Sequence, residues 1–351
     1  MYQSDSRAAE QFRKRLIATA KGSKGAKDMS REEARDALTF LLSSEAHPAQ
    51  IGAFLTAMRF KGARVEEMKG FLDAMEAHAT LISPKVDRLL NCNGPYDGRK
   101  NALHLSLAAA LVTVAAGVPV IMHSNSDLPP KNGVTTASVL EALGIPAHLE
   151  PQQVAKSIEE RGFGHLHASR YLHGVERLKP IRQTLFYRSF LHACEVMLNP
   201  AGAEFSLIGA AHKSFLQRFA TAAGERGQQR VLAVQGLDGC DELPMKPVAV
   251  ADYQQGEMSE YELDPADYGL TYQDHHPCAD AETTAVLTEG LLQGEEKDQL
   301  NPVLYNAGVR LYLCGKVDAI AEGIELAESA LVSGRAAQTL QRLRGCRVEK
   351  G

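Results

Sequence analysis

Two short segments combine residue types that bind phosphate groups and metal ions. The segment "NGPYDGRKN", residues 93–101, places two glycines beside the adjacent cations Arg99 and Lys100. Glycine turns let backbone amides approach an anion, and cationic side chains add charge-assisted hydrogen bonds. The segment "GLDGCDEL" contains the adjacent carboxylates Asp241 and Glu242, which suit Mg²⁺. Both segments can also be read as ordinary turns, one with exposed cations and one acidic.

Strand and helix patterns alternate after Pro84. The short apolar runs "VDRLLNC", "VPVIMH", "GHLHAS" and "RVLAVQG" are separated by helical patterns such as "ASVLEAL", "PQQVAKSIEE" and "LKPIRQTLFYRSFLHACEVML". This alternation predicts an α/β class with a mainly parallel central sheet flanked by helices. Ligands of such sheets bind beyond the carboxyl ends of the strands. We therefore expect "NGPYDGRKN", "HSNSDLPPKNG" and "QGLDGCDEL" to lie together at one edge.

The first part of the chain predicts a small all-helical domain. Ser30 and Glu33 have the spacing of a capping box, and apolar residues then recur at helical intervals. Pro48 is expected in the first turn of a second helix, and "RVEEMKGFLDAMEAHA" predicts a third. The packing face of such a domain could also be a dimer interface.

Composition excludes several classes of protein. The chain has 351 residues, 44% of them hydrophobic and 23% charged, and this is an ordinary globular mixture. A net charge of −5 gives no overall basic character that would indicate nucleic acid or an anionic membrane. The polar N-terminal residues do not predict a signal peptide. The six cysteines, without a C-x-x-C pair, are expected to be reduced thiols in the cytoplasm.

Several motifs follow one another in a set order: "HPAQIGAFLTAMRFKG", "SVLEALGI", "MLNP", "QGLDGCDEL", "DPADYGL" and "AIAEGIELAESALVSGRA". In this order they resemble the anthranilate phosphoribosyltransferase family of glycosyltransferases, as a divergent paralogue. The resemblance implies a helical domain over residues 1–83 and an α/β domain over residues 84–351. It also implies a homodimer formed through the helical domain, with phosphoribosyl diphosphate and an aromatic acceptor as substrates.

The family's diphosphate loop, GTGGD followed by N-x-S-T, is altered in this sequence. Pro95 lacks an amide donor, and Tyr96 replaces a glycine and fills space. Arg99 and Lys100 could supply charge instead. With the matching positions in "HSNSDLPPKNG", the resemblance assigns diphosphate and ribose binding to Gly94, Asp97, Gly98, Arg99, Lys100, Ser106, Asn125 and Lys131.

The acceptor and metal roles also follow from the resemblance. The family pattern P-x-R-x-x-L-x-x-R is matched up to Arg188, whose planar fork suits a carboxylate. His123 and Arg188 are therefore the expected acceptor-binding residues, although His123 could equally be a histidine bonded to the backbone. Asp241 and Glu242 match the family's Asp-Glu pair and are the expected ligands of Mg²⁺, the implied cofactor.

Two functions from different classes follow. The first is a magnesium-dependent transferase that moves phosphoribose from phosphoribosyl diphosphate to an aromatic amine or acid, as in tryptophan biosynthesis. The alternative is an inactive paralogue that binds nucleic acid. Its discriminating feature would be a basic surface made by Arg218, Arg226, Arg230, Arg335, Arg342, Arg344 and Arg347.

Overall fold

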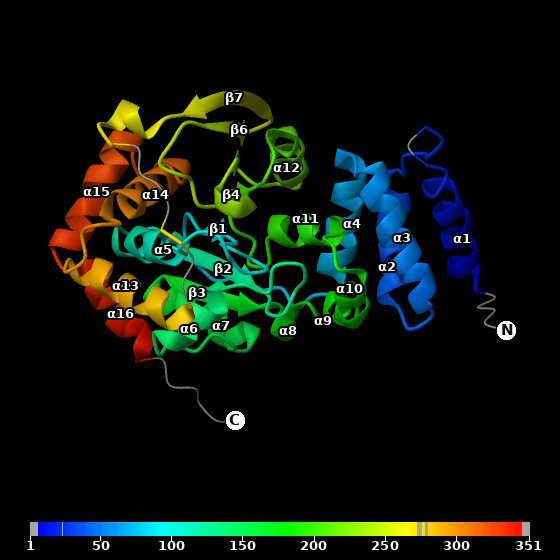
Figure 1. Cartoon of the computed structure of the whole chain (residues 1–351), viewed down its shortest axis with the longest axis horizontal. Helices are drawn as coiled ribbons and strands as arrows, with labels where there is room; N and C mark the ends of the chain where they lie inside the picture. Colours follow the sequence, from blue (N-terminus) through cyan, green and yellow to red (C-terminus); the bar gives the residue numbers. More distant parts are fainter. Residues whose placement is uncertain (1–5, 23, 272–275, 278–279, 346–351) are drawn as a thin grey trace.

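The structure, a computed structural model, describes residues 6–22, 24–271, 276–277 and 280–345. A helical lobe lies at one end of the elongated molecule and a larger α/β lobe at the other (Figure 1). The predicted fold class is confirmed. The helical lobe is built from α1 (Arg7–Thr19), α2 (Arg31–Leu42), α3 (Pro48–Lys61) and α4 (Val65–Ala77).

Local sequence signals determine where the lobe's helices begin. Ser30 Oγ accepts a hydrogen bond from the amide of Glu33 at 3.2 Å, and the Glu33 carboxylate accepts one from the amide of Ser30 at 3.0 Å. Pro48 occupies the first turn of α3, as predicted. Helix α1 was not predicted, because it has few apolar residues; it is held by Phe12, whose ring stacks on Phe40 at 4.7 Å.

The α/β lobe contains a seven-stranded sheet with strand order β3-β2-β1-β4-β5-β6-β7. The first five strands in this order are parallel, and the last two pair antiparallel at one edge. The mainly parallel sheet was predicted, but β4, β6 and β7 were not. The strands are β1 (Leu90–Cys92), β2 (Val120–Ser124), β3 (Phe163–His167), β4 (Phe205–Gly209), β5 (Arg230–Val234), β6 (Val248–Gln254) and β7 (Glu257–Leu263).

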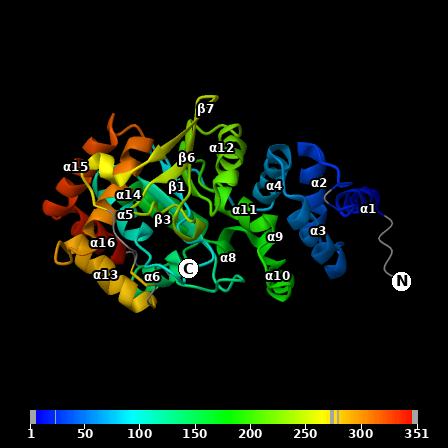
Figure 2. The same ribbon diagram turned by 45° about the horizontal axis from the view of Figure 1, so that its top comes forward.

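Each face of the sheet has its own hydrophobic core. Alternate residues of β2 enter different cores: Val120 and Met122 belong to one, and Ile121 belongs to the other. Figure 2 shows helices on both sides of the sheet. The first core contains residues of α5 (Ser106–Ala115), α6 (Thr136–Ala142), α13 (Ala281–Gln293), α14 (Leu300–Leu313), α15 (Ile320–Val332) and α16 (Arg335–Arg344). The second contains residues of α7 (Pro151–Arg161), α8 (Ala168–Tyr171), α9 (His173–Glu176), α11 (Phe190–Met197), α12 (Leu216–Gly224) and the helical lobe.

Three short 3-10 helices lie among the described residues of the α/β lobe. They are η1 (Lys213–Phe215), η2 (Leu237–Gly239) and η3 (Pro265–Tyr268).

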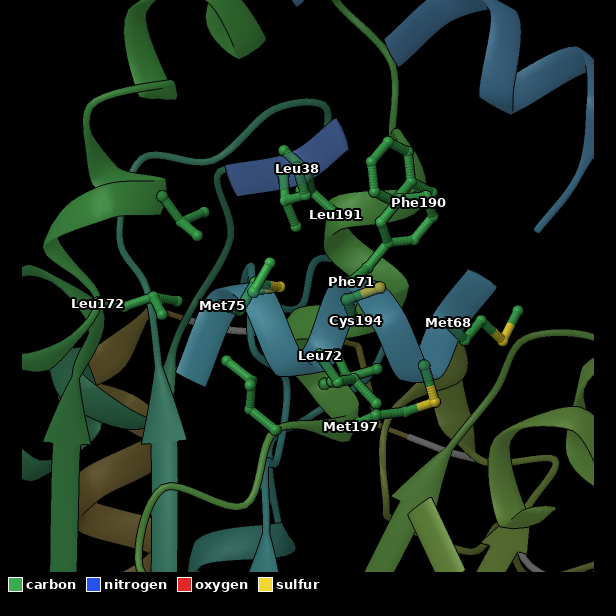
Figure 3. Packing of buried hydrophobic residues seen from close by; sticks show 14 of the residues in the cluster. Leu38, Met68, Phe71, Leu72, Met75, Leu172, Phe190, Leu191, Cys194 and Met197 are labelled. Atoms are coloured by element: carbon green, nitrogen blue, oxygen red, sulfur yellow. The ribbon is translucent and has the colours of Figure 1, made fainter. Parts of the chain in front are cut away.

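The two lobes share one core. The rings of Phe71 in α4 and Phe190 in α11 lie 4.2 Å apart, and Leu191 and Cys194 are buried in the same cluster (Figure 3). The helices α10 (Lys179–Leu185) and α11 pack on α3 and α4 although they follow β3 in the chain. The boundary at residues 83 and 84 stays a prediction.

One predicted helix is interrupted. The segment "LKPIRQTLFYRSFLHACEVML" forms α10 and α11, separated by Phe186, whose φ of 57° is left-handed. A left-handed residue cannot continue a right-handed helix. Arg188 therefore lies in a loop between the helices instead of on a helix face.

Within the residues that the structure describes, no helix combines the length and apolar character needed to cross a membrane. Four cysteines, Cys92, Cys194, Cys240 and Cys314, are buried free thiols, as expected. Cys278 and Cys346 lie outside the described residues.

Three histidines are buried at the ends of β2 and β3. Burial lowers the pKa of His123 to about 3, that of His165 to about 4 and that of His167 to about 3. Nε2 of His165 lies 2.9 Å from the Ser124 hydroxyl, and its Nδ1 lies 3.0 Å from the carbonyl of Ala147. The folded protein therefore holds all three imidazoles neutral at pH values where an unfolded chain would protonate them.

We predict that the melting temperature falls when the pH is lowered from 7 to 5. Below the unfolded histidine pKa of about 6.5 the unfolded chain binds protons that the folded protein excludes, at a cost of up to about 1.4 kcal/mol per pH unit for each histidine. Thermal unfolding followed by circular dichroism at several pH values measures this slope. The variant His165→Gln should show a shallower slope; an identical melting temperature at pH 5 and pH 7 would contradict the prediction.

Candidate functional site

Three loops meet beyond the carboxyl ends of the parallel strands, as the fold rule predicted. The loop after β1 pairs with the loop after β2, because Arg99 and Val134 exchange backbone hydrogen bonds at 2.9 and 3.0 Å. The loop after β5 joins them, since Lys131 Nζ donates to the carbonyl of Asp238 at 2.8 Å. The residues predicted for donor binding and for the metal therefore lie in one neighbourhood.

The turn after β1 requires its glycines. Gly98 has a φ of 88°, and a Cβ there would overlap the backbone of Gly133. Gly94 has a φ of 56°, and its Cβ would lie 2.8 Å from Oγ1 of Thr136. The two predicted glycines thus let the turn fold tightly against the neighbouring loop.

Tyr96 fills the space inside this turn. Its ring is buried, and its hydroxyl donates to Oε1 of Glu195 at 3.4 Å. Burial raises the pKa of Tyr96, so the phenol stays neutral. Glu195 itself is fully buried and receives two hydrogen bonds from Arg182, at 2.7 and 2.6 Å. The space inside this turn is therefore filled by protein atoms.

Asp97 and Arg188 form a bidentate ion pair. The Arg188 guanidinium donates from Nε to Oδ2 at 2.9 Å and from Nη2 to Oδ1 at 2.8 Å. Burial would raise the pKa of Asp97, but its basic neighbours, Arg188 among them, hold it below the ordinary value. Burial also lowers the pKa of Lys131, whose ammonium belongs to the same charge cluster. Arg188, predicted to bind an acceptor carboxylate, already binds one from its own chain.

Arg99 is directed into the protein. Its side chain is fully buried, and Nη1 donates to Oε2 of Glu242 at 2.9 Å and to the carbonyl of Leu103 at 2.6 Å. The same Glu242 oxygen accepts the amide of Leu105 at 3.0 Å, just before α5 begins. A carboxylate of the chain thus takes the position at the helix N-terminus where an anionic ligand would be stabilised.

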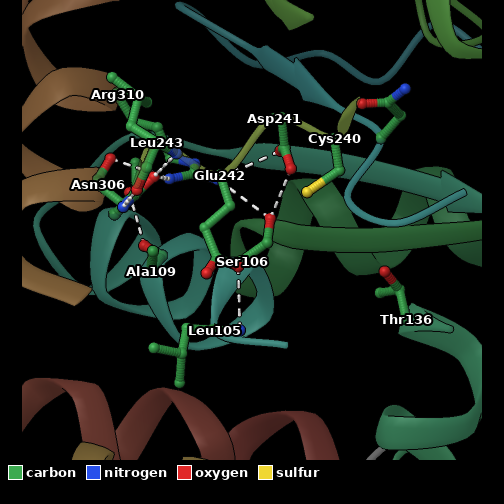
Figure 4. A network of polar contacts seen from close by, with 12 residues as sticks. Leu105, Ser106, Ala109, Thr136, Cys240, Asp241, Glu242, Leu243, Asn306 and Arg310 are labelled. Carbon is green, nitrogen blue, oxygen red and sulfur yellow. Dashed lines mark hydrogen bonds and ion pairs between the residues drawn. The ribbon is translucent and has the colours of Figure 1, made fainter. Parts of the chain in front are cut away.

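Asp241 is enclosed in a similar way (Figure 4). Its Oδ1 accepts the hydroxyl of Ser106 at 2.8 Å, and its Oδ2 accepts Nη2 of Arg310 at 3.2 Å. Asp241 and Arg310 are both fully buried. The predicted residue Ser106 therefore contacts the predicted metal ligand.

The carboxylate pair in this arrangement does not fit a resident magnesium ion. Mg²⁺ keeps several waters in an octahedral shell, but Asp241 is 0% and Glu242 2% exposed, and each faces a guanidinium. Among the described residues no group of three or more His, Cys, Asp or Glu side chains is arranged to hold a metal. Magnesium binding by this pair stays a prediction that requires both arginines to move.

The other predicted binding residues, Asn125, His123 and Lys100, differ in how far their side chains are engaged in hydrogen bonds within the protein. The side-chain amide of Asn125 donates a hydrogen bond to Glu176, and its Oδ1 accepts one from Lys179 Nζ at 3.3 Å. Both polar atoms of this side chain are therefore bonded to other residues of the protein. Nδ1 of His123 lies 3.3 Å from the Tyr171 hydroxyl, while its Nε2 is buried without a partner in the described structure. Lys100 is exposed.

A cavity of about 390 Å³ lies between the lobes, next to these loops. It is lined mostly by apolar side chains of α3, α4, α11 and α12, with Arg188 and Gly239 on the side of the loops. Its volume is within the range of small-molecule sites. Polar and charged side chains also line the cavity, namely Arg59, Ser189 and His192. Its apolar lining includes Met58, Met68, Phe190, Val196, Phe215 and Phe219.

Sequence reasoning missed this cavity and the arginine beneath the carboxylate pair. Arg310 occurs alone in the apolar run "NPVLYNAGVRLYLCG", and a lone charge in a buried helix signals an internal ion pair. Ser189 and Arg59 had no comparable signal, because only the fold of the two lobes brings them to the cavity. His192 did have one, because it replaces an asparagine of the family pattern that the sequence resembles.

The arginines proposed as a basic surface are largely engaged within the protein. Arg226 pairs with Asp73 and Glu76. Arg230, Arg344 and Arg218 bond Asp252, Glu289 and the carbonyl of Ser214, respectively. Arg342 donates to the carbonyl of Glu160. Arg347 lies outside the described residues, and the geometry gives the nucleic-acid alternative no support.

Two family models match this chain and define its class. One, described as "Glycosyl transferase family, a/b domain", matches residues 97–337, and one for the helical bundle domain matches residues 16–79. The chain belongs to this glycosyl transferase family.

Relatives narrow the class further. The anthranilate phosphoribosyltransferase of Rubrobacter xylanophilus is 35% identical over 320 residues, covering 90% of this chain and 92% of the relative. The crystal structure of anthranilate phosphoribosyltransferase (TrpD) from Thermus thermophilus has a TM-score of 0.84 and 29% identity, covering 95% of this chain and 98% of that one. The Saccharomyces cerevisiae enzyme, solved in complex with PRPP and Mg, has a TM-score of 0.81 at 20% identity, covering 98% of each chain, and so shares the fold. The resemblance to this family is confirmed.

We predict that Arg99→Met destabilises the protein by about 3–5 kcal/mol, because it leaves the buried Glu242 carboxylate uncompensated. The double variant Arg99→Met/Glu242→Gln should recover most of this loss, since both charges are then removed. Urea unfolding gives the free energies for the cycle. The matched control Lys100→Met changes an exposed neighbour, and its free energy of unfolding should stay within about 0.5 kcal/mol of that of the starting protein. If Arg99→Met and Arg99→Met/Glu242→Gln lost equal stability, the ion pair between Arg99 and Glu242 would not be the cause of the loss.

Proposed function

We propose that this protein is a phosphoribosyltransferase that uses phosphoribosyl diphosphate and an aromatic amine as substrates. The observation that carries the proposal is the apolar cavity beside the three loops, in a chain that matches the family over both domains. The cavity would hold the acceptor, and the loops after β1, β2 and β5 would hold the donor. Anthranilate is the acceptor in the relatives' name and is therefore the reference compound against which other aromatic amines are compared.

The acceptor side is open in this structure, whereas the donor side is closed. Tyr96 fills the turn after β1, and Arg99 and Asp97 are engaged with Glu242 and Arg188. Donor binding would therefore require the turn to open. Lys131 and Lys100 are the predicted donor ligands that remain available: among the contacts described the Lys131 ammonium bonds only a backbone carbonyl, and Lys100 is exposed.

The reaction needs positioning more than acid-base chemistry. The acceptor nitrogen forms a bond to C1 of the ribose, and the bond from C1 to the diphosphate oxygen breaks with its electron pair on the diphosphate. The nitrogen then loses a proton to water. The leaving group departs as an anion, so cationic side chains can stabilise it without a general acid. Lys131 would perform this role here.

Magnesium stays the expected companion of the donor diphosphate, since the yeast enzyme was solved with PRPP and Mg together. Asp241 and Glu242 stay its predicted ligands, and both would first have to leave Arg310 and Arg99. We assign no step of the transfer to the metal.

Calorimetry with phosphoribosyl diphosphate, with and without MgCl₂, tests the donor site. We expect saturable binding that Lys131→Met weakens by about tenfold, the effect of losing one partly buried charge contact of about 1.4 kcal/mol. The control Lys156→Met removes an exposed lysine of α7 that is not among the predicted donor ligands, and it should change affinity by less than about threefold. Release of diphosphate with an aromatic amine present would then establish transfer. Absence of donor binding under both conditions would refute the proposal.

We also propose that the helical lobe forms a homodimer. Phe60 in α3 is 77% exposed and Ile17 in α1 is 53% exposed, and Phe186, at the end of the helix α10 that packs on α3, is 80% exposed. Large exposed apolar side chains are typical of an interface. Analytical ultracentrifugation should show a dimer that Phe60→Glu dissociates; the exposed apolar residue Val332, in α15 of the other lobe, provides the control Val332→Glu.

A further inference from the structure

The cavity wall offers neutral hydrogen-bonding groups. Ser189 is 9% exposed, and its hydroxyl has no partner within the described structure although it lines the cavity. His192 also lines the cavity, and burial lowers its pKa to about 4, so the imidazole is neutral at pH 7. A hydroxyl and a neutral imidazole can each donate or accept a hydrogen bond. A ligand group that both donates and accepts would satisfy them.

The guanidinium that would bind a carboxylate ligand is already paired with a carboxylate of the chain. Arg188 donates to both oxygens of Asp97, and that carboxylate is 4% exposed. A second carboxylate at this place would meet the negative charge of Asp97. Burying a carboxylate without a compensating partner costs far more than burying an amide, for which the cost is about 1–3 kcal/mol.

Arg59, the other cation that lines the cavity, does not offset the cost of burying a carboxylate ligand there. Arg59 bonds the carbonyl of Arg188 and lies 5.0 Å above the ring of Tyr187, with its side chain exposed to solvent. An ion pair at such a position contributes about 0–1 kcal/mol, because water and salt screen it. The rest of the wall is apolar, with Met58 and Phe219 among its residues. The buried neutral groups therefore dominate recognition.

We infer that the cavity accepts a neutral aromatic amine carrying an amide-like group, instead of an aromatic carboxylate. The inference deepens the proposed function and depends on it for the identity of the cavity as the acceptor site. The aromatic ring packs among the methionine and phenylalanine side chains, and the amide-like group bonds Ser189 and His192. Asp97 is then the residue that determines specificity, because it occupies Arg188.

Binding of a matched pair of probes tests this without any donor. In calorimetry, 2-aminobenzamide should bind at least about tenfold more tightly than 2-aminobenzoate, which differs only in replacing the amide by a carboxylate. Asp97→Asn frees the guanidinium for a bidentate carboxylate contact and should reduce this ratio by at least about tenfold. Tighter binding of the benzoate by the unchanged protein, or failure of both probes to bind, would overturn the inference.

Further variants separate recognition from folding. Asp97→Asn/Arg188→Met removes both charges together and should lower the ratio of 2-aminobenzamide to 2-aminobenzoate affinity less than Asp97→Asn alone does, because no guanidinium remains to bind the benzoate; a ratio as low as that of Asp97→Asn would overturn the inference. Ser189→Ala should weaken 2-aminobenzamide about three- to tenfold and leave aniline, which lacks the amide, unchanged. Circular dichroism verifies that each variant is folded. These binding measurements contain no phosphoribosyl diphosphate. A protein that fails to transfer phosphoribose would therefore still show the same ratio of 2-aminobenzamide to 2-aminobenzoate affinity.

Discussion

Pairing of buried arginines with carboxylates is the interaction that determines the form of the cleft. Separating such a pair leaves an uncompensated charge in a medium of low polarity, which costs several kcal/mol. The pairs join the loops after β1 and β5 to each other, to α14 and to the segment between α10 and α11, so the loops are held as a group. The four pairs are Arg99–Glu242, Arg310–Asp241, Arg182–Glu195 and Arg188–Asp97.

These pairs give the two halves of the cleft different character. On the donor side the chain's own cations neutralise its own carboxylates, and Tyr96 fills the glycine turn. On the acceptor side an apolar cavity stays open between the lobes. The residues that match the family's pattern are thus paired with groups of this chain. Family membership is therefore stronger evidence for the fold and for the location of the site than for the identity of the ligands that bind there.

Residue patterns predicted the architecture well where local physics decides it. The capping box at Ser30, Pro48 in the first turn of α3 and the meeting of three loops at one sheet edge all follow from short-range rules. The break at Phe186 and the inward direction of Arg99 depend on contacts with residues far along the chain. A side chain's type indicates that it can bind an anion, but only the tertiary fold decides which anion it meets.

The core shared by the lobes limits how the molecule can open. Phe190 of the α/β chain segment packs on Phe71 of the helical lobe, so rotating the lobes apart would expose these rings at about 25 cal/mol for each Å² of apolar surface. A hinge motion of whole lobes is correspondingly disfavoured. Donor entry is then expected to depend on local opening of the turn after β1, which leaves the shared core of the two lobes intact.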